Sequence, residues 1–274
     1  MKDEKISRSW QWQTVEGGSY LTCGLLSSWQ HGFFTKDFYP RTPKKLTSVL
    51  QPEAIAYRTK QVHGNLVLTP QEINIAIKKQ DSSNSFPDAD AVISDRPNQS
   101  VWVASADCTP ILFGDRQTGQ VGAIHAGWRG TSQAITKQAI ARFIESGSHL
   151  ENLRIAIGPA ISGEVYQVDE VVAIEVCKTI VANGARRSDA EMLKELQQLS
   201  NSPIADDELP GKVRLNVARV NQIQLEQLNI NPQQIAIAQD FCTYQQNELF
   251  FSYRRTGEKK VQWSGIVSTI AVQN

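Results

Sequence analysis

The chain has 274 residues, and its 28 Lys plus Arg balance its 28 Asp plus Glu, so the formal net charge is zero. That length can bury a core without disulfides or structural metals, and 41% hydrophobic with 20% charged residues is ordinary for a globular protein. A neutral chain has no overall field to attract a phosphate backbone, which argues against general nucleic-acid binding. We therefore expect a globular protein with no nucleic-acid partner.

The cysteines and the N-terminal segment indicate a compartment. The four cysteines are scattered singly, without a C-x-x-C pair, which disfavours a zinc finger, a thioredoxin motif and a disulfide framework. The segment MKDEKISRSWQWQ lacks the apolar stretch of a secretory signal, and no run approaches the roughly 18 apolar residues of a membrane helix. We expect a cytoplasmic protein with reduced cysteines and no membrane partner.

Hydrophobic periodicity predicts an α+β fold. Short apolar, β-branched runs predict strands, and apolar residues repeating every three to four positions predict helices. The strands are expected at 66–68, 91–94, 101–104, 111–113, 121–124, 155–157, 235–238 and 261–272. The first helix is expected to run from an N-cap at Thr131 or Ser132 to a C-cap at Gly147. Further helices are expected over 169–183, 189–199 and 216–228, with Asp169 capping the first of these and Asn216 the last. Surface loops are expected at 78–88 and 201–211.

Clustered strands followed by strand–helix alternation indicate mixed β-sheets flanked by helices. No internal repeat or long linker divides the chain, so residues 1–274 are expected to form a single large domain.

Three motifs bring together residues that bind metals. They are KQVHG (60–64), SADCTPILFGD (105–115) and VGAIHAGWRGT (121–131), and each borders a predicted strand. His63, Cys108 and His125 supply two imidazoles and one thiolate, a set suited to zinc that leaves a fourth position for water or substrate. The sequence gaps are 45 and 17 residues, so only folding could assemble the site. Two alternatives stay open: separate structural roles for the three residues, or a metal-free catalytic pair of Cys108 and His125.

The third motif also predicts an anion site. A strand ends at His125, the turn from Gly127 through Arg129 to Gly130 follows, and a helix is expected to begin at Thr131. Free N–H groups at a helix N-terminus, a close backbone approach at the glycines and the guanidinium fork together favour phosphate. The alternative is a tight turn with a packed tryptophan. The spacing matches neither a P-loop nor a dinucleotide-binding motif.

Further polar residues are weaker candidates. Asp90, in DADAVISD, and Asp107 could orient a ligand histidine or move a proton. Gln61 and Arg255 are candidates for contacts to phosphate or substrate. His31, in the segment HGFFTK, could lie near the pocket.

Several segments together resemble one protein family. HGFFTK, KQVHG, DADAVISD, ADCTPILFGD, VGAIHAGWRG, IGPAISGEVYQV and CTYQQNELFFSYRRTG follow one another in an order that resembles the laccase-domain, or YfiH-like, family. Its members are also called polyphenol oxidases and peptidoglycan editing factors. The resemblance implies an α+β fold like that of the cytotoxic necrotizing factor catalytic domain, and a zinc ion held by His63, Cys108 and His125. It also implies phosphorolysis of adenosine, guanosine, inosine and methylthioadenosine, together with adenosine deamination.

The resemblance leaves alternatives open. A peptidoglycan-precursor editing hydrolase would use the same three residues, and a non-enzymatic binding role is a further alternative. A copper-dependent polyphenol oxidase is disfavoured because the chain has only four histidines and, beyond Met1, one methionine in a polar helix. Copper could still occupy the site adventitiously.

The chain also departs from the family pattern in three segments. Ala160 and the pair Glu164-Val165 replace the usual cysteines, residues 37–40 (DFYP) replace a Gly-Gly-Val-Ser run, and Glu258-Lys259-Lys260 replace a Thr-Gly-Arg run. The first difference argues against a role for those thiols, and the second weakens any transfer of substrate contacts from residues 37–40. The first does not touch the three expected metal ligands.

Overall fold

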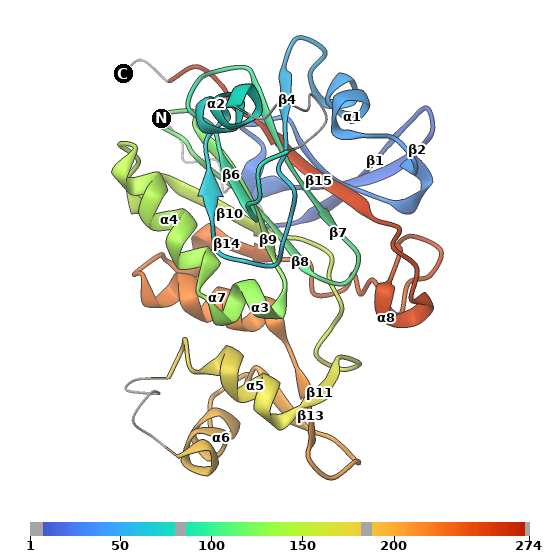
Figure 1. Ribbon diagram of the computed structural model, residues 1–274, viewed down its shortest axis with the longest axis vertical. Helices are drawn as coiled ribbons and strands as arrows, with labels where there is room; N and C mark the ends of the chain where they lie inside the picture. The colour runs from blue at the N-terminus through green and yellow to red at the C-terminus, as the bar shows by residue number, and fades with distance from the viewer. Residues whose placement is uncertain (1–7, 80–85, 182–187, 272–274) are drawn as a thin grey trace.

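The computed structural model describes residues 8–79, 86–181 and 188–271, and Figure 1 shows mixed β-sheets flanked by helices. The predicted α+β class is confirmed. The first sheet has the strand order β1-β2-β3-β15-β7-β4. Its strands are β1 (Trp10–Val15), β2 (Gly18–Cys23), β3 (His31–Phe34), β4 (Ile55–Tyr57), β7 (Gln99–Ser105) and β15 (Gln262–Val267).

The second sheet has the order β14-β10-β8-β9-β6-β5. Its strands are β5 (Val67–Leu68), β6 (Ala91–Ile93), β8 (Thr109–Asp115), β9 (Val121–Ala126), β10 (Leu153–Ile157) and β14 (Ile235–Ile237). Strands β8 and β9 pair antiparallel, with Pro110 opposite His125. This register places the start of β8 beside the end of β9.

The two large sheets pack face to face, and alternation along the strands shows which side each residue covers. In β7, Val101 and Val103 enter the core shared with the second sheet, whereas Trp102 faces α1 (Pro43–Leu50). In β8, Leu112 enters the shared core, whereas Phe113 packs toward α4 (Ile135–Glu145). Burial of both faces explains the nearly continuous apolar runs that predicted these strands.

A third, smaller sheet forms a separate layer at the lower end of the molecule in Figure 1. Its strands, in the order β11-β13-β12, are β11 (Gln167–Asp169), β12 (Ile204–Asp206) and β13 (Lys212–Leu215). They share a core with α5 (Glu170–Cys177), α6 (Asp189–Gln197) and α7 (Val217–Gln227). The extent of a single domain over 1–274 stays a prediction.

The helix expected after Gly130 is divided in two, so its predicted N-cap is wrong. The short α3 (Trp128–Ser132) begins after Gly127, and Ala134, with φ 56°, separates it from α4. Thr131 is fully buried and its hydroxyl accepts a hydrogen bond from the Asn221 amide at 3.0 Å, so it packs against α7 instead of capping a helix. Gly147 follows α4 with φ 98°, as expected of a C-terminal glycine.

Other boundaries also differ from the predictions. The expected loop 201–211 contains β12, the expected strand 261–272 ends at Val267, and the expected helix 169–183 ends at Cys177. Residues 80–85 of the expected loop 78–88, residues 182–183 and residue 272 lie outside the described residues. The strands of residues 10–34, together with α1, α2 (Pro70–Lys79) and the four-residue α8 (Tyr253–Thr256), were not expected.

Within the described ranges, no helix combines the length and apolar character that crossing a membrane would require.

His31 lies in the core and does not line the cavity described below, so its expected place near the pocket is wrong. Its Nε2 accepts a hydrogen bond from the Cys23 N–H at 2.8 Å, and its Nδ1 donates to the Trp29 carbonyl at 2.8 Å. Burial lowers the pKa of His31 to about 4. The imidazole is therefore neutral in the folded protein at pH values where an exposed histidine would be protonated.

We predict a stability loss at acid pH that depends on His31. Between pH 6.5 and 4 the unfolded chain binds a proton at this residue that the folded protein does not, so the free energy of unfolding falls as pH decreases, by up to about 1.4 kcal/mol per pH unit. Urea unfolding between pH 4.5 and 7 measures this dependence of the free energy of unfolding on pH. The contribution of His31 should remain in His149→Gln, which changes an exposed histidine, and should be lost in His31→Gln. Equal slopes in the two variants would contradict the assignment.

Candidate metal centre

The structure brings His63, Cys108 and His125 together. Their potential ligand atoms all lie within 4.8 Å of one another, and the two imidazole rings are 4.9 Å apart with an interplanar angle of 80°. His63 comes from the loop between β4 and β5, Cys108 from the turn between β7 and β8, and His125 from the end of β9. Strand pairing thus assembles a group that can hold a metal ion; we call these three residues the triad.

The carboxylate of Asp90 orients both histidines of the triad. This fully buried residue accepts hydrogen bonds through Oδ1 from Nδ1 of His125 and from the backbone N–H of His63, each at 2.9 Å. Its Oδ2 accepts from the N–H groups of Gly64 at 2.8 Å and Val62 at 3.1 Å. Because Nδ1 of His125 is engaged, Nε2 is left to face a metal.

The backbone at His63 depends on the same carboxylate. His63 has φ 61°, a left-handed conformation that non-glycine residues adopt at an energetic cost. The three hydrogen bonds from residues 62–64 to Asp90 hold this conformation and turn the imidazole toward Cys108. Asp90 is therefore a positioning residue for two ligands at once.

The charges within the triad favour a thiolate. Burial by itself would raise the pKa of the Cys108 thiol, but the charge and hydrogen bonds of His125 and His63 lower it to about 6. Burial would likewise lower the pKa of His125, but the Cys108 thiolate and the Asp90 carboxylate raise it to about 9. The thiolate is the form of cysteine that binds metals, so the surroundings prepare Cys108 as a ligand.

The glycines of the HAGWRG motif provide space around the triad. A Cβ atom at Gly127 would lie 2.9 Å from Cys108 Sγ and 3.2 Å from His63 Cδ2. At Gly130 it would lie 2.9 Å from the carbonyl oxygen of Gly64. Both glycines allow the loops that carry the ligands to pack closely, which explains them without reference to a bound anion.

Three other residues predicted to bind phosphate, Arg129, Thr131 and Arg255, do not line the cavity next to the triad, whereas Gln61 does. Arg129 is exposed and its guanidinium lies over the Trp128 ring, 4.3 Å from the centroid. The hydroxyl of Thr131 is engaged in the core, as described above. Arg255 donates hydrogen bonds to the carbonyls of Thr243, Tyr244 and Phe250 and so fixes the C-terminal loop. Phosphate contacts at these residues stay a prediction.

Asp107 and Gln61 lie beside the triad, and both side chains anchor neighbouring backbone. Asp107 accepts hydrogen bonds from the Thr243 hydroxyl at 2.8 Å and the Arg254 N–H at 2.7 Å, which ties the C-terminal segment to the turn that holds the cysteine. Gln61 donates to the Ala104 carbonyl and accepts from the Ala104 N–H, both at 2.7 Å. It thereby fixes the loop that carries the first histidine to strand β7.

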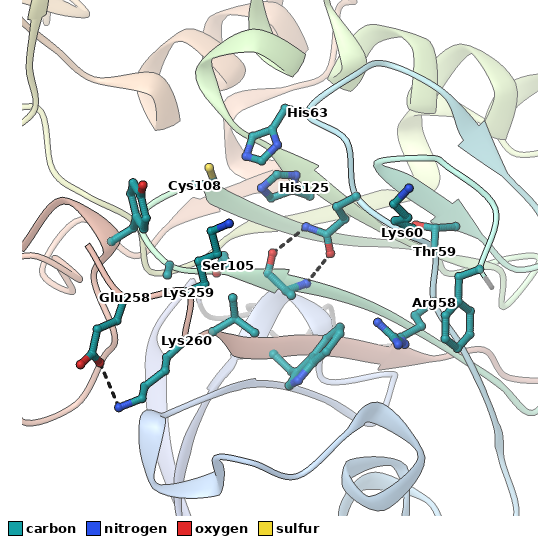
Figure 2. A pocket seen from close by; sticks show the side chains of 17 residues that line it. Arg58, Thr59, Lys60, His63, Ser105, Cys108, His125, Glu258, Lys259 and Lys260 are labelled. Atoms are coloured by element: carbon teal, nitrogen blue, oxygen red, sulfur yellow. Dashed lines mark hydrogen bonds and ion pairs between the residues drawn. The ribbon is translucent and has the colours of Figure 1, made fainter. Parts of the chain in front are cut away.

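A cavity of about 840 Å³ opens next to the triad and is lined by residues of both large sheets. Figure 2 shows the triad on one side of this cavity and Arg58 on the other. The remaining lining was not predicted from the sequence; it includes Arg58, Lys60, Phe86, Lys259 and Trp263. Their only signal in the sequence is that Arg58 and Lys60 precede the KQVHG histidine and that Lys259 replaces part of the usual Thr-Gly-Arg run.

The fold and the triad define a protein with a group that can hold a metal ion beside a cavity, and comparison with known proteins supplies the family. Residues 42–270 match the family described as multi-copper polyphenol oxidoreductase laccase, and the chain belongs to this family.

Relatives with assigned names share this sequence over much of its length. A purine nucleoside phosphorylase of Synechocystis sp. is 51% identical over 259 residues, which is 94% of this chain and 97% of that protein. The purine nucleoside phosphorylase YfiH of Escherichia coli is 32% identical over 195 residues, 71% of this chain and 66% of its own.

Two solved structures share the fold. YlmD from Geobacillus stearothermophilus aligns with a TM-score of 0.75, and the YfiH protein of Bacillus licheniformis with a TM-score of 0.72. Each is 23% identical and covers 94% of this chain and 98% of its own.

We predict that Asp90→Asn weakens metal binding by about 10- to 100-fold, because the amide cannot accept all four hydrogen bonds and leaves His125 poorly oriented. Competition against a chromogenic chelator measures this affinity. Asp88→Asn is the matched control, because that carboxylate is exposed and pairs with Lys60 on the surface. Wild-type affinity in Asp90→Asn would show that the carboxylate does not position the ligands.

Gly127→Ala is expected to reduce metal affinity at least tenfold, because the added methyl group would press on Cys108 Sγ and His63. Gly64→Ala is the control within the same site, since its Cβ would meet Asp90 Oδ2 at an ordinary 3.6 Å. Metal titration of both variants, with thermal unfolding to check the fold, tests the difference. Equal affinities would contradict the packing argument.

Proposed function

We propose that the protein is a zinc-dependent purine nucleoside phosphorylase of the cytoplasm. The observation that carries this proposal is the triad at one side of a cavity of about 840 Å³, within the size range of small-molecule sites. The names of relatives at 51% and 32% identity support the same reaction class. The four free cysteines support a reducing compartment.

Zinc fits the donor set. Two imidazoles and a thiolate are a three-ligand combination that catalytic zinc sites use, and His63 is exposed toward the cavity. A bound zinc ion would supply Lewis acidity at this end of the cavity. Copper also binds such ligands, but a multi-copper centre needs more histidines than the two found here. His31 is engaged in the core and His149 lies in an exposed turn, so neither adds a ligand.

In this proposal the chain's own residues prepare the site before substrate arrives. Asp90 holds a proton on Nδ1 of His125, which keeps Nε2 directed at the cavity. Asp107 and Gln61 hold the two loops that border the triad. Inorganic phosphate attacks C1′ of the nucleoside, the bond to the base breaks, the base takes up the proton that phosphate loses, and the sugar 1-phosphate and the free base result. We propose adenosine, guanosine, inosine and methylthioadenosine as substrates, and deamination of adenosine in the same cavity.

We predict that the purified protein contains about one zinc ion per chain and releases hypoxanthine from inosine only when phosphate is present. Removal of the metal with a chelator should abolish the reaction and added zinc should restore it. His125→Ala should lose both metal and activity, whereas His149→Ala should retain them. Metal analysis and chromatography of products over a nucleoside panel provide the measurement.

The same measurements separate the alternatives. Full activity after metal removal would overturn the zinc assignment and favour the metal-free pair of Cys108 and His125. No base release from any nucleoside, with amino-acid release from a peptidoglycan precursor, would favour the editing hydrolase.

A further inference from the structure

The side of the cavity opposite the triad contains an arginine held in a fixed position. The Arg58 guanidinium lies over the Phe86 ring, 3.9 Å from its centroid, and over the Trp263 ring, 5.5 Å from its centroid. No described residue accepts a hydrogen bond from this guanidinium or forms an ion pair with it, although the side chain is half-buried. Two aromatic faces therefore hold a planar set of donors that remains free for a ligand.

The positive charges that line the cavity also outnumber the carboxylates that pair with them. Two of its lysines are paired with carboxylates, Lys60 with Asp88 at 3.3 Å and Lys260 with Glu258 at 2.9 Å. Lys259 has no carboxylate partner among the described residues, and in Figure 2 its side chain extends into the cavity. Together with the arginine it gives the cavity an excess positive charge in a chain whose net charge is zero. The local field therefore favours an anionic ligand.

The geometry of phosphorolysis indicates where such an anion would lie. The attacking phosphate and the departing base occupy opposite faces of the anomeric carbon, so the phosphate must lie across the sugar from the residues next to the base. In Figure 2 the triad and Arg58 lie on opposite sides of one cavity. A guanidinium fork also matches the oxygens of a phosphate group in a bidentate manner.

We propose that Arg58, held between Phe86 and Trp263, binds the phosphate group of the reaction, and that the purine base occupies the triad side of the cavity. The assignment of the reaction rests on the proposed function, whereas phosphate binding at Arg58 is a property of the cavity itself. The inference differs from the phosphate site predicted at Gly127–Thr131, where the threonine hydroxyl is buried and the arginine stacks outside the cavity.

Arg58→Met tests the proposal, because methionine retains contact with the two rings but has no charge or donors. Arg41→Met is the matched control, since Arg41 also stacks on an aromatic ring, Phe38 at 5.4 Å, but does not line the cavity. Binding of inorganic phosphate to the zinc-loaded proteins is measured by calorimetry and by phosphorus NMR, which require no turnover. We expect phosphate affinity to fall at least about tenfold in Arg58→Met and to stay at the wild-type value in Arg41→Met.

Arg58→Lys keeps the charge without the planar fork and should bind phosphate with intermediate affinity. Zinc content and thermal unfolding establish that each variant is folded. Where the enzyme turns over, the KM for phosphate should rise in Arg58→Met while the KM for inosine stays constant. Unchanged phosphate binding in folded Arg58→Met would overturn the proposal, as would a loss that appears only in Arg129→Met.

A second arm identifies the source of the phosphate group. Adenosine and adenosine 5′-monophosphate are titrated into wild-type protein and Arg58→Met. Tighter binding of the monophosphate that disappears in the variant would assign the arginine to a phosphate carried by the substrate, and loss of inorganic phosphate binding alone would assign it to the free ion. Phosphate binding that depends on Arg58 without any phosphorolysis would support this inference while refuting the proposed function, so the two can fail separately.

Discussion

The site depends on one buried carboxylate. Asp90 accepts four hydrogen bonds, from the imidazole of His125 and from three consecutive backbone N–H groups of the loop that carries His63. Hydrogen bonds to a charged group contribute about 1.5 to 3 kcal/mol each, enough to offset the cost of burying the carboxylate and of the left-handed backbone at His63. Without this acceptor, no single group would fix the positions of His63 and His125, which lie on separate elements.

Close packing holds the turn that carries Cys108, the third residue of the triad. Cys108 lies in the turn between two strands, and Gly127 lies against its sulfur with no room for a side chain. Asp107 fastens the C-terminal segment to the same turn, which brings the loop with Lys259 to the edge of the cavity. The HAGWRG and ADC motifs can therefore be understood as the packing and anchoring requirements of one compact site.

The two sides of the cavity carry chemically different groups. On one side are soft and borderline ligands, a thiolate and two imidazoles, which suit a transition metal. On the other is the guanidinium of Arg58, a cation with a planar set of N–H donors, which suits an oxyanion. A nucleoside with its base on the triad side and a phosphate ion beside the arginine would match both sides. This division relates the proposed nucleoside chemistry to the shape of the cavity.

The sequence predicted the features that are set by residues close to one another along the chain. The buried strands of the second sheet, the helix that Asn216 caps and the choice of His63, Cys108 and His125 all follow from apolar runs, a capping residue and the donor atoms themselves. The strands of residues 10–34 were missed because polar residues interrupt their apolar pattern and their pairing partners, not local periodicity, stabilise them.

Only the tertiary structure decided the role of each polar side chain at the site. The side chains of Thr131 and Arg255 are engaged within the fold because their partners, Asn221 and the carbonyls of residues 243–250, come from other segments. Arg58 became a candidate ligand-binding residue because folding brings Trp263, about 200 positions away in the sequence, against its guanidinium. The sequence by itself determined which donor atoms the chain possesses, whereas strand register and packing decided which of them remain free to bind a ligand.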